Sequence, residues 1–160
     1  MIRFIKRKRA VALFVVAAGT ATAVALASAP SNFSGGPVVI ANLQQDVHVN
    51  SERIKFQTKD PTDTGIFKLE FGANSKSGWH HHNGMVLVQV QQGTVRVYDS
   101  SCAYKTYGVD LPSGSVFVEG ETVHQVTSEA GATAYATAVV EKHVPAAFRD
   151  EDAPPFCDNH

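Results

Sequence analysis

From residue 40 onward, apolar and polar residues alternate in short runs that are separated by turn-forming residues. A period of two places successive side chains on opposite faces of a strand, and no window in this region shows the 3.6-residue period of an α-helix. The pattern predicts short strands at 47–49, 53–56, 66–71, 85–91, 94–98, 115–119, 122–127 and 133–140. So many short strands in about 100 residues predict an all-β domain, either a sandwich or a jelly-roll barrel.

The chain of 160 residues has room for one such domain, because this length supports one hydrophobic core. We assign residues 46–144 to the domain, and we expect residues 28–45 to be a linker and N-terminal extension, since 28–37 are rich in Ser, Gly and Pro. Residues 145–160 form a C-terminal tail, whose charged stretch 149–152 predicts a solvated segment. Turns are predicted at Pro61-Thr62-Asp63, Asn83-Gly84, Gln92-Gly93 and Pro112-Ser113-Gly114.

The first 27 residues have the composition of an export signal. Residues 1–9 carry five cations and no acid, and an apolar run of 18 residues follows at 10–27. The basic start, the apolar run and the small residues Ala25 and Ala27 predict a signal peptide, with Ser28 beginning the mature chain. The same run is long enough for an uncleaved membrane anchor, and this alternative stays open.

Export changes the charge of the protein and its expected partners. Without the five cations of the signal, nine Lys and Arg stand against 15 Asp and Glu, a charge of −6 with neutral His. No basic stripe remains, so we expect no nucleic-acid partner. The protein is expected to be secreted or periplasmic, and to contact a membrane only if the N-terminal segment is uncleaved.

Export also bears on the two cysteines of the chain, Cys102 and Cys157. In an oxidising compartment, an even number of cysteines favours a disulfide. Cys102 lies in the middle of the domain and Cys157 lies near the end of the tail. A bridge between them would tie the tail back to the domain.

The candidate chemistry begins in the stretch "GWHHHNG", residues 78–84, which holds three of the seven histidines. Residues i and i+2 of a strand share one face, so His80 and His82 point one way and His81 points the other. In the strand that follows, one face carries only valine and is the better interior: Val86, Val88 and Val90. A further candidate, His124, stands in "ETVHQVTS".

Two stretches, "GWHHHNGMVLVQVQQG" and "LPSGSVFVEGETVHQVTSEAG", resemble the two motifs of the cupin superfamily. His80 and His82 match the histidine pair of the first motif, and Gly93 matches its closing glycine. Gly114 and His124 match the glycine and the histidine of the second motif. The resemblance is to small exported single-domain cupins, and it implies a single jelly-roll barrel. In such a barrel, the histidine pair, a glutamate and the later histidine bind one divalent metal at the barrel mouth.

The chain departs from these motifs at the expected metal site. The position of the family's glutamate is occupied by Val86, which cannot bind a metal. In the second motif, the turn Gly120-Glu121-Thr122 is one residue short, and the family's asparagine falls near Ser128. The alternative to a metal site is therefore a degenerate, metal-free barrel. The metal site that we predict consists of three histidines: His80, His82 and His124.

Three imidazoles suit Fe, Ni, Cu or Zn, whereas Mn generally prefers a carboxylate oxygen. A divalent ion on three neutral imidazoles keeps its full charge, so it favours a small anionic or chelating ligand. We do not expect His48, His81 or His143 to bind the metal.

Two classes of function stay open for a monomeric or homodimeric protein. The first is a metal-dependent dioxygenase or a related small-molecule enzyme, and the second is a module that binds a metal or a small ligand without chemistry. An enzyme normally needs an acid or a base near the metal. The candidates are Glu119, Glu121 and Tyr98, but strand parity does not place them inside, so no catalytic residue is assigned.

Overall fold

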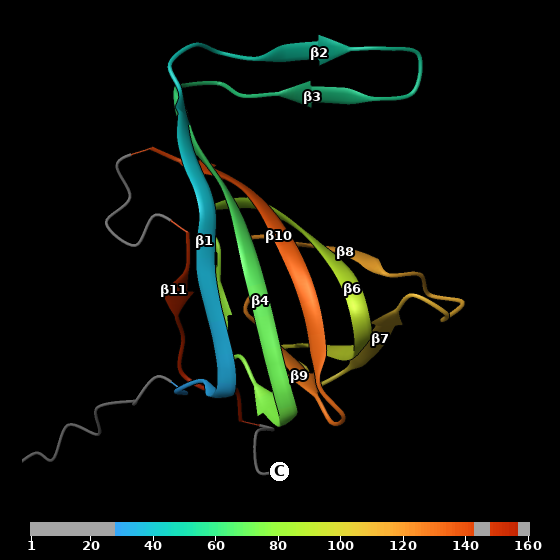
Figure 1. Cartoon of the computed structure of the whole chain (residues 1–160). Helices are drawn as coiled ribbons and strands as arrows, with labels where there is room; N and C mark the ends of the chain where they lie inside the picture. The colour runs from blue at the N-terminus through green and yellow to red at the C-terminus, as the bar shows by residue number, and fades with distance from the viewer. Residues whose placement is uncertain (1–27, 143–147, 157–160) are drawn as a thin grey trace, which may run out of the picture.

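Figure 1 shows the computed structural model, which describes residues 28–142 and 148–156. The predicted signal segment at 1–27, His143 and Cys157 lie outside the described residues. In the described part of the chain, every regular element is a strand, and no helix there could span a bilayer. The strands are β1 (Ser31–Leu43), β2 (His48–Asn50), β3 (Lys55–Gln57), β4 (Thr62–Lys76), β5 (His80–His81), β6 (Gly84–Asp99), β7 (Tyr104–Gly108), β8 (Val116–Glu119), β9 (His124–Ser128), β10 (Ala132–Glu141) and β11 (Asp150–Glu151).

Four antiparallel pairings close the strands into a barrel. Strand β4 pairs with β10, β10 with β6, β6 with β9, and β9 pairs back with the end of β4. The long strands β1, β4, β10 and β6 curve side by side in that order (Figure 1). Further strands extend this sheet: β7 and β8 pair with β6, and β5 pairs with β9 and β11. The predicted all-β barrel is thus confirmed.

Strand β6 corrects one predicted turn. The sequence predicted two strands broken at Gln92-Gly93, but β6 continues through these residues as one strand of 16. Before the bend it pairs with β10 and β8, and after it with β7 and β9. Gly93 has a φ of +77° at this bend, where a Cβ atom would lie 2.2 Å from the carbonyl oxygen of Gly131. Glycine is therefore needed to bend the strand and not to end it.

The expected linker at 28–37 mostly belongs to β1, which corrects the assignment from composition. Strand β1 pairs along β4, from Ser31 opposite Lys76 to Leu43 opposite Thr62. Most of its side chains are exposed, so backbone hydrogen bonds hold it and no hydrophobic period marks it. Between its end and the start of β4, strands β2 and β3 form a hairpin that extends away from the barrel (Figure 1).

The barrel core has small residues on its central strand and large ones on both neighbours. On β10 alternate residues are buried, and Ala136 lies opposite Phe67 of β4 and Val88 of β6. The predicted valine face of β6 is buried, since Val86, Val88 and Val90 are each less than 5% exposed. Because alanine fills little space between larger neighbours, this arrangement leaves room inside the barrel.

Candidate metal centre

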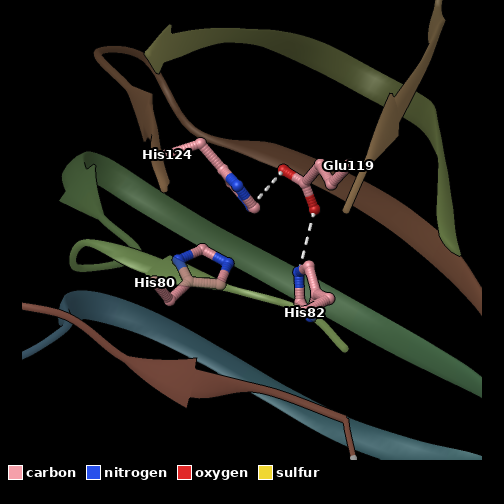
Figure 2. A group of neighbouring side chains, drawn as sticks. All are labelled: His80, His82, Glu119 and His124. Atoms are coloured by element: carbon pink, nitrogen blue, oxygen red, sulfur yellow. Dashed lines mark ion pairs between the residues drawn. The ribbon is translucent and has the colours of Figure 1, made fainter. Parts of the chain in front are cut away.

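Three strand ends bring four ionisable side chains together inside the barrel (Figure 2). His80 lies on β5 and His82 follows it, Glu119 ends β8, and His124 begins β9. All four are buried, with exposed fractions between 3% and 9%. Each offers one ligand atom, and these four atoms lie within 4.8 Å of one another. The three histidines singled out in the sequence are therefore neighbours in the structure.

Strand parity holds at the histidine run, although β5 has only two residues. His80 and His82 face inward with ring centroids 5.0 Å apart, whereas His81 is half-buried on the other side. There, Nδ1 of His81 lies 2.7 Å from a carboxylate oxygen of Asp152, and Nε2 lies 3.6 Å from Asp150. His81 thus contacts acidic residues of the C-terminal segment and is not part of the cluster.

Glu119 places a carboxylate beside the three predicted histidines, and the four residues together could hold a metal ion. Val86 is a buried core residue on β6, and its cross-strand partner on β8 is Glu119. Directly paired residues on antiparallel strands present their side chains on the same face. A carboxylate therefore faces the histidines from β8, at the position paired with Val86 of β6.

The sequence carried a signal for Glu119 in the pattern of β8. Residues two apart share a face, so Glu119 shares the face of Phe117, which is 6% exposed. The other face carries Val116 and Val118, which are 46% and 63% exposed. Because both faces are apolar, parity alone did not choose the inner one. Of the other two candidate acids or bases, Glu121 is exposed and Tyr98 is half-buried outside the cluster.

A short backbone constraint positions the histidine run. Gly78 has a φ of +79°, and a Cβ atom there would lie 2.2 Å from the carbonyl oxygen of Ser28. Only glycine fits both the conformation and this close approach. Two residues later, His80 pairs in register with His124 of β9, and the backbone N–H of His82 donates to Gly120 O at 2.9 Å.

Each of the three inward histidines is oriented by a backbone carbonyl. The Nδ1–H of His80 donates to Gly78 O at 2.9 Å, and that of His124 donates to Thr122 O at 2.7 Å. The Nδ1–H of His82 donates to the carbonyl oxygen of Phe148. A proton on Nδ1 leaves Nε2 with a lone pair, which is the arrangement that outer hydrogen bonds give to metal-binding histidines.

Glu119 holds its charge beside the Nε2 atoms. Its carboxylate oxygens lie 3.3 Å from Nε2 of His82 and 3.2 Å from Nε2 of His124 (Figure 2). Burial raises the pKa of Glu119, but contact with His124 and His82 outweighs burial and lowers it overall. Burial lowers the pKa of His124, but Glu119 outweighs it and raises the pKa overall. Burial, with His124 and Arg149 nearby, lowers the pKa of His80 to about 3, so His80 is neutral at pH 7.

These residues fit a divalent transition metal. Among the described residues, Nε2 of His82, Nε2 of His124 and Oε1 of Glu119 are buried without a hydrogen-bond partner. Their close contacts are the ion pairs with one another, and a bound cation would contact all of them at once. Three imidazole nitrogens and one carboxylate oxygen form a ligand set that Zn, Fe, Ni, Cu or Mn accepts. With Glu119 bound, a divalent ion keeps a net charge of +1, and the sequence argument against Mn no longer holds.

A cavity of about 220 Å³ opens beside the cluster. His80, His82 and Glu119 form part of its wall, and Ser77 and Arg149 are its other polar residues. The rest is apolar, with Ala136 and Ala138 of β10 at positions where larger side chains would fill it. Its large apolar side chains are Phe33, Phe67, Leu69, Phe71, Phe117 and Phe148.

The C-terminal segment is part of this wall, which corrects the prediction of a solvated tail at 149–152. Asp150 and Glu151 form β11 and pair with His81 and His80 of β5. Phe148 packs edge-on against Phe67, with ring centroids 4.9 Å apart. No pattern in the sequence indicated this docking, because the segment has only two paired residues and a charged composition. The predicted bridge from Cys102 reaches Cys157, outside the described residues, and it stays a prediction.

Fold and site together define a small single-domain β-barrel with a buried three-histidine, one-glutamate cluster at the edge of an apolar cavity. No protein-family model matches the chain. No curated protein matches it either.

Solved structures are similar to this chain at low identity. A conserved protein of unknown function from Streptococcus pyogenes is 13% identical, over 70% of this chain and 76% of that chain, with a TM-score of 0.46. A cupin superfamily protein from Desulfitobacterium hafniense is 10% identical, over 65% and 80%, with a TM-score of 0.42. A salicylate 1,2-dioxygenase from Pseudoaminobacter salicylatoxidans, in complex with gentisate, is 15% identical, over 46% and 19%, with a TM-score of 0.39.

All three structures are similar to this chain at an identity of 15% or less and a TM-score below 0.5. At such identities and TM-scores, they carry no argument about the function of this chain.

Proposed function

We propose that the barrel binds one divalent transition metal and holds a small organic anion beside it in the apolar cavity. The residues that bind the metal are His80, His82, Glu119 and His124. Glu119 completes a set of four donors, and an ion there keeps a positive charge that attracts an anion. The bound metal would supply Lewis acidity or, if it is iron or copper, redox chemistry.

One observation carries this proposal. All three histidines give their Nδ1 proton to a backbone carbonyl, so three Nε2 lone pairs meet the Glu119 carboxylate in a buried space. In a metal-free barrel the Nε2 atoms of His82 and His124 would have only Glu119 as a partner, and each buried polar atom left unpaired costs about 1–3 kcal/mol. This argument supports a metal site over the metal-free alternative.

The test is the metal content of protein expressed without a His-tag. We expect about one transition metal per chain by elemental analysis, and a fall in melting temperature when a strong chelator is added, because a ligand that binds only the folded state stabilises it. Protein without metal, whose melting temperature is unchanged by added zinc and by chelator, would favour the degenerate barrel.

The activity separates an oxygenase-type enzyme from a binding module. Apart from the four proposed ligands, the polar side chains of the cavity wall are Ser77 and Arg149. Neither is a ready proton acceptor at neutral pH, which supports metal-centred chemistry over hydrolysis by a separate general base. A redox metal together with oxygen consumption on addition of a small organic acid would favour the enzyme. Zinc together with unreacted ligand would favour the module.

We also propose that the protein is exported, by cleavage before Ser28, to the periplasm or the outside of the cell. N-terminal sequencing of protein from the exporting cell should begin at or near Ser28, and residues 1–9 on membrane-bound protein would indicate an anchor. We expect a disulfide between Cys102 and Cys157 in the exported protein. Mass spectrometry without reductant should then find neither thiol alkylated.

A further inference from the structure

The cavity beside the cluster has one cationic residue in its wall, Arg149. It stands on the C-terminal segment, directly after Phe148. The guanidinium donates from Nη2 to Ser77 O at 2.5 Å, and from Nε and Nη2 to Glu151 at 2.5 and 3.0 Å. The structure gives no partner for Nη1 among the described residues. Nε and Nη2 of the guanidinium are thus anchored, which leaves Nη1 as the donor without a partner in the described part of the chain.

The position of Arg149 is fixed by the same segment that orients a proposed metal ligand. The carbonyl of Phe148 accepts the Nδ1–H of His82, and the Phe148 ring lies against Phe67. A Cβ atom on Gly65 would lie 3.1 Å from this ring, so the ring is seated on the glycine. The guanidinium is therefore held beside the cluster by the contacts of Phe148 and by its own hydrogen bonds to Ser77 and Glu151.

The shape and the charge of the cavity together select a class of ligand. At about 220 Å³, the cavity is below the roughly 300–1,000 Å³ of sites for drug-sized molecules. Most of its wall is apolar, and its polar residues are Ser77, His80, His82, Glu119 and Arg149. A compact apolar body with one anionic head matches this division.

We infer that the ligand is a small monocarboxylate with an apolar, planar or branched body, and that Arg149 determines this preference. The inference rests on the proposed metal site and deepens it. The carboxylate binds between the metal and the Arg149 guanidinium, and the body packs among the phenylalanine rings. Nε and Nη2 of Arg149 are held by Glu151 and Ser77, so Nη1 is the group that donates to the ligand. A hydrogen bond to a charged carboxylate is stronger than one to a neutral group.

The test compares benzoate with benzamide, which has the same ring and nearly the same shape but no charge. Both are titrated calorimetrically into zinc-loaded, untagged protein, after the zinc content of each variant has been measured. We expect the wild type to bind benzoate at least about tenfold more tightly than benzamide. In Arg149→Gln, the affinity for benzoate should fall about ten- to a hundredfold, while the affinity for benzamide and the zinc content stay the same.

Two further variants control this comparison. Arg96→Gln removes an arginine that contacts Glu129 and Tyr104 and lies outside this cavity wall, so it should change neither affinity. Ala136→Leu adds bulk to the cavity wall, so it should weaken benzoate and benzamide alike while zinc is retained.

The outcomes separate this inference from the proposed function. Equal affinity of the wild type for both ligands, binding of neither, or an unchanged benzoate preference in Arg149→Gln overturns the inference while zinc binding stands. Failure of the wild type to take up zinc overturns the proposed function itself. If Arg149→Gln also loses zinc, Arg149→Lys decides: it keeps the charge without the fork, so its benzoate preference should fall severalfold, and an unchanged preference contradicts the inference.

Discussion

The metal-site end of the barrel and the β2–β3 hairpin are built in opposite ways. At the site, β5 and β11 have two residues each, yet the ligand side chains are buried and each is held by a hydrogen bond or an ion pair. In the hairpin, the two strands pair regularly, but they pair only with each other and most of their side chains are exposed. Regular pairing is therefore a poor guide to which part of this chain is fixed.

The difference shows where rigidity comes from in this barrel. A hairpin of two strands with no packed face is marginally stable on its own. The site is fixed by contacts between chain segments that are distant in sequence. One of them is the hydrogen bond between His82 and Phe148, which are 66 positions apart. Changes at the site should therefore affect metal binding strongly, whereas changes in the hairpin should affect it little.

The largest effect is expected from His82→Ala. This variant removes one of four donors and leaves Glu119 with a single histidine contact, so zinc affinity should fall by more than about a hundredfold, beyond the usual loss from an outer-shell change. His81→Ala is the matched control, because His81 faces Asp152 on the other side of β5. Zinc competition with a chromophoric chelator measures both. Equal losses would mean that the inward and outward assignments are wrong.

The next largest effect tests whether Glu119 of β8 supplies the carboxylate of the metal site. Glu119→Gln keeps the shape but removes the charge, and we expect zinc affinity to fall about ten- to a hundredfold. Val86→Glu in the same variant places a carboxylate on the paired position of β6, so part of the affinity should return.

Val86→Glu alone supplies the control for this pair. Two buried carboxylates would then face each other, one of which must take up a proton, so unfolding in urea should occur at a lower concentration. If the double variant binds zinc no better than Glu119→Gln, residues 86 and 119 do not share one site.

A smaller effect, on the free energy of unfolding, is expected at Gly78. It separates the cost of a close backbone contact from the cost of a positive φ alone. Gly78→Ala meets both a positive φ and the Ser28 carbonyl at 2.2 Å, so the free energy of unfolding should fall by about 2–4 kcal/mol. Gly114→Ala has a similar φ of +78° with nothing within 4 Å, and it should cost about 1–2 kcal/mol. Urea denaturation measures both. Equal costs would argue against a tight contact before the histidine run.

The smallest effect is expected when the hairpin is removed. Leu43 and Thr62 pair directly, so residues 45–60 can be replaced by a short Asn-Gly turn that joins β1 to β4. We expect the free energy of unfolding to change by no more than about 0.5 kcal/mol, and the zinc content to stay the same. A large loss of either would show that the hairpin supports the barrel.

Periodicity in the sequence predicted most of the barrel strands, but not β7, and it placed His80 and His82 on one face, because both depend on local alternation. It did not predict β1, whose exposed residues are held only by backbone pairing with β4. Nor did it predict that Glu119 lies beside the three histidines, since this depends on the register between β8 and β6. The docking of Phe148 at His82 was missed for the same reason, as register and docking depend on contacts between distant segments.

The hydrogen bond from His82 to the Phe148 carbonyl also bears on the order of folding. Contacts between residues far apart in sequence carry a large cost in loop entropy, so they form late and slow the reaction. An intermediate that has paired only β4, β10 and β6 would lack Glu119 of β8, His124 of β9 and the carbonyl of Phe148. We expect added zinc to leave the refolding rate nearly unchanged and to slow unfolding. The ion would then stabilise the folded barrel without taking part in the folding nucleus.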